Sequence, residues 1–143
     1  MRPFRVLGFF FLSFCFCLLF LPAFAEEFNK EFDGFKSPTG NIFCLIFEST
    51  LRCDLLQNDA TLPTRPKDCE LDWGNAFGVG PQNQKAQRVC AGDTVANPEY
   101  PVLNYGKSIS KAGFTCRSER TGMTCKNKFG RGFFLSRQKQ TLF

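Results

Sequence analysis

The strongest constraint on this chain comes from two identical cysteine spacings. Cys44 and Cys53 enclose eight residues, as do Cys116 and Cys125, and Cys69 and Cys90 lie between the two pairs. An even set of cysteines in a small chain that leaves the cytosol indicates disulfides, because thiols oxidise there and a small core needs cross-links. More than one pairing is possible. The equal spacings favour Cys44 with Cys53 and Cys116 with Cys125, which leaves Cys69 for Cys90.

Each short cysteine loop predicts a β-hairpin that is pinned across its two strands. With Cys44 opposite Cys53, Ile46 lies opposite Leu51, and one face of the first hairpin is wholly apolar. In the second hairpin, residues 119–122 form the turn, in which Gly122 can adopt a positive φ. The side chains of the second hairpin are more polar, so we expect it to lie nearer the surface.

The N-terminus predicts a secretory signal peptide over residues 1–25. Two arginines precede an apolar run, and the small residues Ala23 and Ala25 close the run before a charged pair, so we expect cleavage after Ala25. An uncleaved membrane anchor is the alternative, although no cluster of Lys and Arg follows the run. After cleavage, residues 26–143 would form one exported domain, in the periplasm or outside the cell, with no membrane span.

The amino-acid composition excludes several kinds of catalytic and metal-binding site. The chain has no His, which excludes Ser/His/Asp triads, Cys/His dyads and His-based zinc sites. It also has no C-x-x-C pair, so disulfides account for the cysteines better than a metal does. We therefore expect no metal and no cofactor, and we assign no catalytic residue.

Helical periodicity is weak, whereas β-branched and aromatic residues recur between turn signals. The sequence therefore predicts a mostly β fold, a small single disulfide-stapled domain of hairpins with one or two short helical turns. Its expected strands are residues 42–47, 51–56, 101–106 and a closing strand at 132–137, with mostly loops over 57–101 and a short amphipathic helix or lead-in at 26–35. The two equal cysteine loops also hint at an internal duplication.

Six ordered segments stand out over about residues 35–143. They are Ser37-Pro38-Thr39-Gly40-Asn41-Ile42-x-Cys44, Arg52-Cys53-Asp54, Cys90-Ala91-Gly92-Asp93-Thr94-Val95, Leu103-Asn104-Tyr105-Gly106, Gly122-x-Thr124-Cys125-x-Asn127, and Gly132-Phe133-Phe134-Leu135-Ser136-Arg137. Together they resemble a family of small exported bacterial proteins annotated only as a domain of unknown function. Arg131 stands where that family commonly has a His, so any role of that His is missing here. The resemblance implies export and a disulfide-bonded domain, and it implies no activity.

Three other patterns are candidates for chemistry. Asp93, next to Gly92, could pair with Asp54, Asp72 or Glu99 as two carboxylates of a hydrolase, although an Asp beside a Gly more often caps its own turn. Residues 108–111 match S-x-x-K without the companion motifs of that enzyme class. Four aromatic residues could form a platform for a sugar or a peptide, or could fill the core: Trp73, Phe77, Tyr100 and Tyr105.

Charge is distributed unevenly along the chain. Residues 26–106 contain twelve acidic and seven basic side chains, whereas residues 107–143 contain nine basic side chains and only Glu119 as an acid. The second part predicts a basic surface for an anionic partner, unless the two parts neutralise each other. The candidate residues for binding an anionic ligand are Lys107, Lys111, Arg117, Arg120, Lys126, Lys128, Arg131 and Arg137.

The leading hypothesis is therefore a non-enzymatic envelope or secreted module, a binding protein or an inhibitor. Its partner would be an anionic envelope polymer or another exported protein, and not nucleic acid, since no nucleic-acid-binding module is present. A small carboxylate-dependent hydrolase acting on envelope polymer is the first alternative. A purely structural envelope protein is the second.

Overall fold

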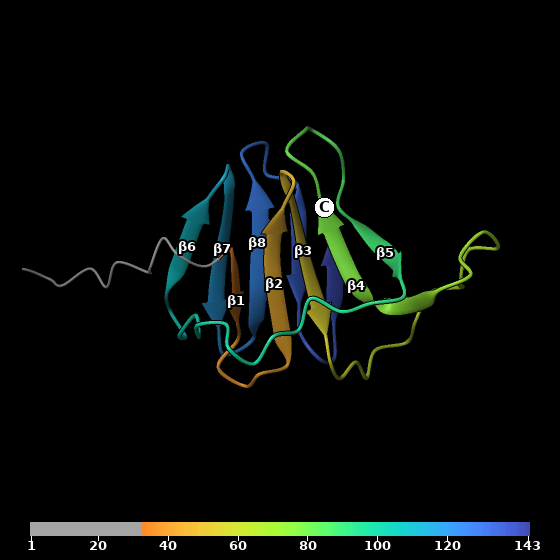
Figure 1. Ribbon diagram of the computed structural model, residues 1–143, viewed down its shortest axis with the longest axis horizontal. Helices are drawn as coiled ribbons and strands as arrows, with labels where there is room; N and C mark the ends of the chain where they lie inside the picture. Colours follow the sequence, from red (N-terminus) through yellow and green to blue (C-terminus); the bar gives the residue numbers. More distant parts are fainter. Residues whose placement is uncertain (1–32) are drawn as a thin grey trace, which may run out of the picture.

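A computed structural model describes residues 33–143 as two antiparallel β-sheets (Figure 1). The predicted signal peptide and most of the predicted lead-in segment at 26–35 lie outside the described residues. The part of the chain that the structure describes contains no helix, and so none long enough to cross a membrane. The prediction of a mostly β fold is confirmed, and the prediction of one or two short helical turns is wrong for the described residues.

The first five strands form sheet A, in which each strand pairs with the next one along the chain. Its order is β1-β2-β3-β4-β5. The strands are β1 (Gly34–Lys36), β2 (Ile42–Phe47), β3 (Thr50–Leu55), β4 (Asp72–Val79) and β5 (Gln87–Ala91).

The last five strands form sheet B in the same way, in the order β10-β9-β8-β7-β6. The strands are β6 (Ser108–Lys111), β7 (Phe114–Glu119), β8 (Gly122–Asn127), β9 (Gly132–Leu135) and β10 (Gln140–Leu142). Both sheets are thus five-stranded meanders. Sheet B follows sheet A along the chain, after a connection of residues 92–107.

The two sheets match in register as well as in order. Cys44 in β2 faces Cys53 in β3, and Cys53 faces Phe77 in β4. In sheet B, Cys116 faces Cys125, and Cys125 faces Phe133 in β9. The inner faces pack together, so that the Phe77 and Phe133 rings lie 6.2 Å apart at their centroids. The matching strand order and register therefore support the internal duplication that the equal cysteine spacings suggested.

Three disulfides cross-link the sandwich: Cys44–Cys53, Cys69–Cys90 and Cys116–Cys125. These are the pairs that the spacings favoured. The sulfur atoms of Cys44, Cys53 and Cys125 lie within 4.8 Å of one another in the core, but sulfurs bonded in disulfides are not the thiolates that bind metals. Disulfides indicate an oxidising location outside the cytoplasm.

A long connection, which we call the strap (residues 92–107), leads from β5 to β6 across the outer face of sheet A (Figure 1). Its Val95 amide donates to Asp54 of β3, and its Pro101 carbonyl accepts from Lys36 of β1. The Tyr100 ring packs so closely on Gly34 that no side chain would fit there. The strap therefore covers part of the outer face of sheet A, around Phe43 and Asp54, and leaves Phe47 exposed.

Several predicted boundaries need correction. Residues 57–101 contain β4 and β5, whose Gly, Asn and Gln residues imitate a loop composition. The predicted strand at 101–106 is part of the strap and makes one parallel bridge, between Lys36 and Val102. The strand at 132–137 does not close the sheet, because it ends at Leu135 and β10 follows.

The second hairpin is not nearer the surface than the first. Cys116, Met123 and Cys125 are at most 2% exposed, as deeply buried as the cysteines of the first hairpin. Its charged residues belong to one face, because Arg117 and Lys126 alternate with these buried residues and point outward, whereas the inward polar residues Ser118 and Asn127 are buried.

Candidate functional site

One cavity of the described chain lies at one end of the sandwich, and we call it the end cavity. It has a volume of about 380 Å³, within the range of about 300–1,000 Å³ typical of small-molecule sites. Both sheets line it, through the β1–β2 turn, the start of the β3–β4 loop, the β7–β8 turn and the β9–β10 turn. Three tight turns and the start of one long loop therefore meet around one hollow.

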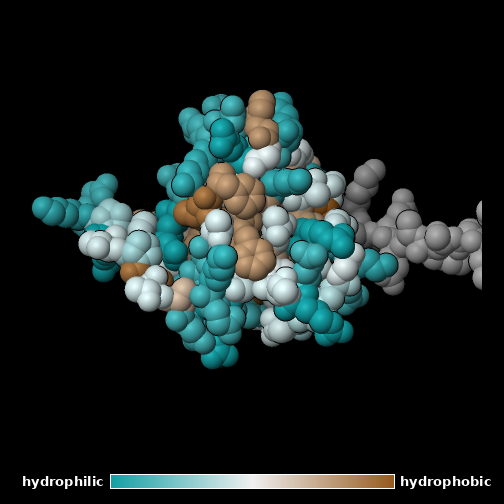
Figure 2. All heavy atoms as spheres, turned by 180° about the vertical axis from the view of Figure 1, so that it is seen from behind, coloured by the Kyte–Doolittle hydropathy of each residue, from teal (hydrophilic) through white to brown (hydrophobic). Residues whose placement is uncertain are grey.

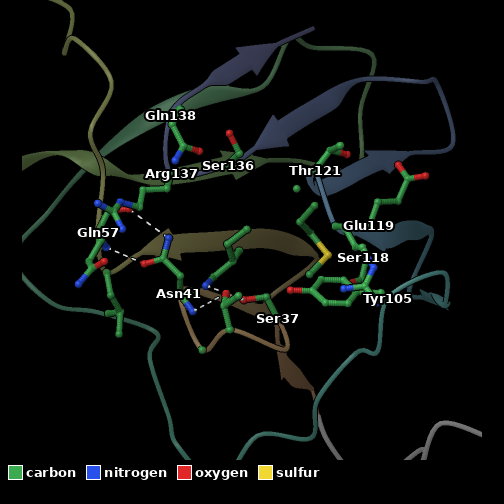
Figure 3. Close-up of a pocket in the computed structure, with 17 residues that line it drawn as sticks. Ser37, Asn41, Gln57, Tyr105, Ser118, Glu119, Thr121, Ser136, Arg137 and Gln138 are labelled. Carbon is green, nitrogen blue, oxygen red and sulfur yellow. Dashed lines mark hydrogen bonds between the residues drawn. The ribbon is translucent and has the colours of Figure 1, made fainter.

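The wall from sheet A is held rigidly by its own hydrogen bonds. The Asn41 side chain donates to the Gln57 carbonyl at 3.1 Å and accepts from the Gln57 amide at 2.8 Å (Figure 3). The Ser37 hydroxyl accepts from the Ile42 amide at 3.0 Å and bonds the Thr39 hydroxyl at 3.2 Å. This wall fixes the shape of the cavity before any ligand binds.

Tyr105, the last aromatic residue of the strap, lies on the other side. Its ring is half-buried, and its hydroxyl points toward Ser37 (Figure 3). The Arg120 guanidinium from the β7–β8 turn lies 5.0 Å from the centre of that ring. Within the described chain, the side chains of Tyr105, Thr121 and Gln138 make no hydrogen bond with protein. The cavity thus offers a hydroxyl, an amide and a cation to a ligand.

A second guanidinium comes from the β9–β10 turn. Arg137 pairs with Asp59 through its Nε at 2.5 Å, and the Asp59 amide donates to the Arg137 carbonyl at 2.8 Å. This contact fixes the arginine, and its two terminal nitrogens make no hydrogen bond with residues 33–143. Glu119, the only carboxylate among the lining residues, lies across the cavity from Gln57 (Figure 3). The charged groups of the lining are therefore two guanidiniums and one carboxylate.

The structure does not gather the eight predicted basic residues into one patch. Arg120 and Arg137 line the end cavity, whereas Lys128 and Arg131 lie in the β8–β9 turn at the opposite end of sheet B. Arg117 and Lys126 lie on the outer face between these ends, and Lys107 and Lys111 lie at the β6 edge. Lys111 pairs with Asp33 at 2.6 Å, and Arg137 with Asp59, so the two parts of the chain neutralise each other in part.

The candidate carboxylates Asp54 and Asp93 are brought together, by Arg52. We call these three residues the clasp. Asp54 is 4% exposed and accepts from the Arg52 Nε at 2.9 Å, the Arg52 Nη2 at 3.0 Å and the Val95 amide at 3.0 Å. Arg52 also donates to the side chain and the carbonyl of Asp93, at 2.9 and 2.8 Å. The clasp holds the strap onto β3.

This arrangement suits structure better than hydrolysis. Asp54, Asp72 and Asp93 do line one cavity of about 370 Å³. However, the hydrogen bond and the charge of Arg52 lower the pKa of Asp93, whereas a general acid needs a raised pKa. Asp54 already accepts three hydrogen bonds, and Glu99 lies farther along the strap and is not among the residues lining this cavity. Asp93 is therefore poorly suited to act as a general acid, and the hydrogen bonds of Asp54 hold Arg52 and the strap.

Comparison with known proteins identifies the family and nothing more specific. A family model described as a family of unknown function, DUF6636, matches residues 13–143. The chain belongs to the DUF6636 family. No curated protein and no solved structure matches it.

The segments that resemble DUF6636 have two locations in the fold. Those around Arg52 and Asp93 form the clasp, and Asn127 holds the β4–β5 loop by donating to the Gly80 and Gln82 carbonyls. The others meet at the end cavity: residues 37–42, Tyr105, Gly122 and residues 136–137. The DUF6636 segments thus build a scaffold and surround one hollow.

The remaining candidates are not assembled into a site. Phe77 is in the core, Trp73 is half-buried beside the Cys69–Cys90 disulfide, Tyr100 packs on Gly34, and only Tyr105 reaches the end cavity. The S-x-x-K residues lie on the edge strand β6 and not at a helix start.

Sequence reasoning missed the polar residues of the end cavity. It singled out Tyr105, Arg120 and Arg137, but not Ser37, Asn41 or Gln57. The available signal was that several resemblance segments lie in turns, where functional residues are common.

Proposed function

We propose that this DUF6636 protein is an exported, non-enzymatic binding module, and that its end cavity takes an anionic, hydroxylated group of an envelope polymer. The observation that carries the proposal is the convergence of the Arg120 and Arg137 guanidiniums with hydroxyl and amide groups around one hollow of about 380 Å³. Guanidiniums bind carboxylates and phosphates through paired hydrogen bonds. Hydroxyls and amides suit the polyol part of the same ligand.

The lining supports binding rather than hydrolysis of such a polymer. Glycosidases of the usual kind need two carboxyl groups about 5–10 Å apart. Glu119 is the only carboxylate among the residues that line the end cavity. The disulfides support a location outside the cytoplasm, and the predicted signal peptide supports export to the periplasm or the medium.

The test is isothermal titration calorimetry with a short oligogalacturonate, a soluble acidic sugar chain. Arg120→Ala is the informative variant, because it removes one guanidinium from the cavity. Lys128→Ala is its matched control, since Lys128 also lies in a turn of sheet B with its Nζ 5.1 Å from an aromatic ring centre, that of Phe129. We expect Arg120→Ala to weaken binding about tenfold, the effect of one charge-assisted hydrogen bond, and Lys128→Ala to change it less than twofold.

Salt dependence separates charge recognition from other binding. Rising ionic strength screens exposed charges, so the affinity should fall between low and high salt. An equal loss of affinity in the Arg120→Ala and Lys128→Ala variants would show that the overall charge of the protein, and not the end cavity, binds the oligogalacturonate. Absence of binding by the wild-type protein to both carboxylated and phosphorylated polyols would overturn the proposal.

A further inference from the structure

The outer faces of the two sheets differ although their strands match. In sheet A, the strap covers the outward residues Phe43, Asp54 and Ala76, which are all less than 9% exposed. In sheet B, no described segment crosses the outer face. We call this surface the open face. Its outward residues with side chains include Ser108, Ser110, Thr115, Arg117, Glu119, Thr124, Lys126, Phe134 and Thr141.

The covered face shows how such a sheet holds an extended polypeptide. Two outward side chains of β3 hold the strap there: Asp54 accepts from a backbone amide, and Arg52 donates to a backbone carbonyl. Each is next to the disulfide cysteine Cys53 in the sequence. The same positions beside Cys125 in β8 are Thr124 and Lys126.

Thr124 and Lys126 are suited to the same kind of contact. A Thr hydroxyl can donate to a carbonyl or accept from an amide, and Thr115 lies opposite Lys126 on β7 with the same groups. Lys126 is exposed, as is Arg117, which lies opposite Thr124. Apolar side chains gather in the middle of this side of the molecule (Figure 2), and the register places the half-buried Phe134 beside Thr124. The open face therefore offers hydrogen-bonding groups around an apolar centre.

The charge of the open face indicates which kind of partner would bind there. Arg117 and Lys126 lie on the face together with one acid, Glu119, whose carboxylate pairs with Arg117 at 3.4 Å, and Lys128 and Arg131 lie in the turn at one end of the face. The cations therefore outnumber the acid on and beside this face. A segment rich in Asp and Glu complements this surface, and a basic one is repelled.

We propose that the open face docks an extended acidic polypeptide segment of a partner protein, which lies across the strands of sheet B as the strap lies across those of sheet A. This surface adjoins the end cavity at Glu119, but the residues that its test changes do not line that cavity. The two proposals have different probes and different variants, so either can fail alone.

The test is fluorescence anisotropy with a labelled decaglutamate peptide. The double variant Arg117→Glu/Lys126→Glu reverses the charge of the open face, and Lys67→Glu/Lys85→Glu makes the same change at exposed lysines elsewhere. We expect the first variant to weaken peptide binding at least tenfold and the second less than threefold. Because both variants change surface residues, matching thermal melts will show that each is folded.

A second variant tests a contact of the open face that does not depend on charge. Thr124→Val removes a hydroxyl at the position of Arg52 without changing charge, and we expect it to weaken the peptide about threefold.

Four outcomes overturn the proposal. The first is no binding of decaglutamate by the wild-type protein. The second is equal weakening by the two double variants. The third is binding that appears only when Glu26, Glu27 and Glu31 are changed to Gln, which would make this chain's own acidic segment the occupant. If the open face binds oligogalacturonate and not the peptide, the occupant is a polysaccharide and the proposal is also wrong.

Discussion

Sheets A and B are the same meander built twice, with a disulfide at the same register, yet their outer faces differ. The clasp and the strap bury Phe43, Asp54 and Ala76 on the outer face of sheet A, whereas the position of sheet B that is equivalent to Asp54 is the exposed Lys126. Connections differ in the same way: sheet A has the long β3–β4 loop, and sheet B has only short turns. The comparison teaches that one scaffold carries an outer face that its own strap partly covers and an equivalent outer face that no described segment crosses.

The largest effects should come from the disulfides that the two sheets share. Each hairpin bond closes a loop of similar length, so removal of either should lower the free energy of unfolding by about 2–4 kcal/mol. We therefore expect Cys44→Ala/Cys53→Ala and Cys116→Ala/Cys125→Ala to be similarly destabilised in urea titrations. Reduction of all three bonds should unfold the domain, since net stability is about 5–15 kcal/mol.

A large difference between these two double variants would break the comparison. It would mean that the sheets match in pattern but not in their contribution to stability. Circular dichroism with and without reductant gives the companion result, and an unchanged melting midpoint would contradict the role of the disulfides.

The next largest effect is a loss of stability that should differ between equivalent positions of the two sheets. Asp54→Ala leaves the Val95 amide without its acceptor and the half-buried Arg52 without its main partner, so we expect a loss of about 2–4 kcal/mol. Lys126→Ala changes the equivalent position of sheet B, where the side chain is exposed, and should cost less than about 0.5 kcal/mol. Urea unfolding of both variants measures the difference, and equal losses would show that the strap does not depend on the clasp.

The smallest effect concerns the exposed end of the clasp. Arg52 lowers the pKa of Asp93 below its ordinary value of 3.8, so the ion pair stabilises the fold above that pH. This stability is lost as the pH falls through the lowered pKa. Asp93→Asn should therefore be slightly less stable than the wild type at neutral pH, with a difference that vanishes in strong acid. A difference that grows as the pH falls would contradict the assignment.

Much of the central architecture could be predicted from the sequence, because the governing signals are local. Equal cysteine loops with alternating apolar residues fix both hairpins and their registers. β4, β5 and β10 were harder to predict. Gly74, Gly78 and the prolines nearby gave residues 57–101 a loop composition, and β10 has only three residues.

The candidate site depends on contacts that no local pattern shows. Arg52 and Asp93 are 41 positions apart, and only the path of the strap brings them together. The end cavity likewise combines residues from Ser37 to Gln138. The charge count found the basic half of the chain, but not its division between the end cavity, the open face and the far turn.

The central claim is that the open face of sheet B binds and the covered face of sheet A does not. Titration of the ¹⁵N-labelled protein with decaglutamate, followed by amide chemical shifts, tests it most directly. We predict shifts at Thr115, Thr124 and Lys126, and none at the equivalent Phe43, Arg52 and Asp54. Shifts centred on the strap and β3, with sheet B unchanged, would contradict the account.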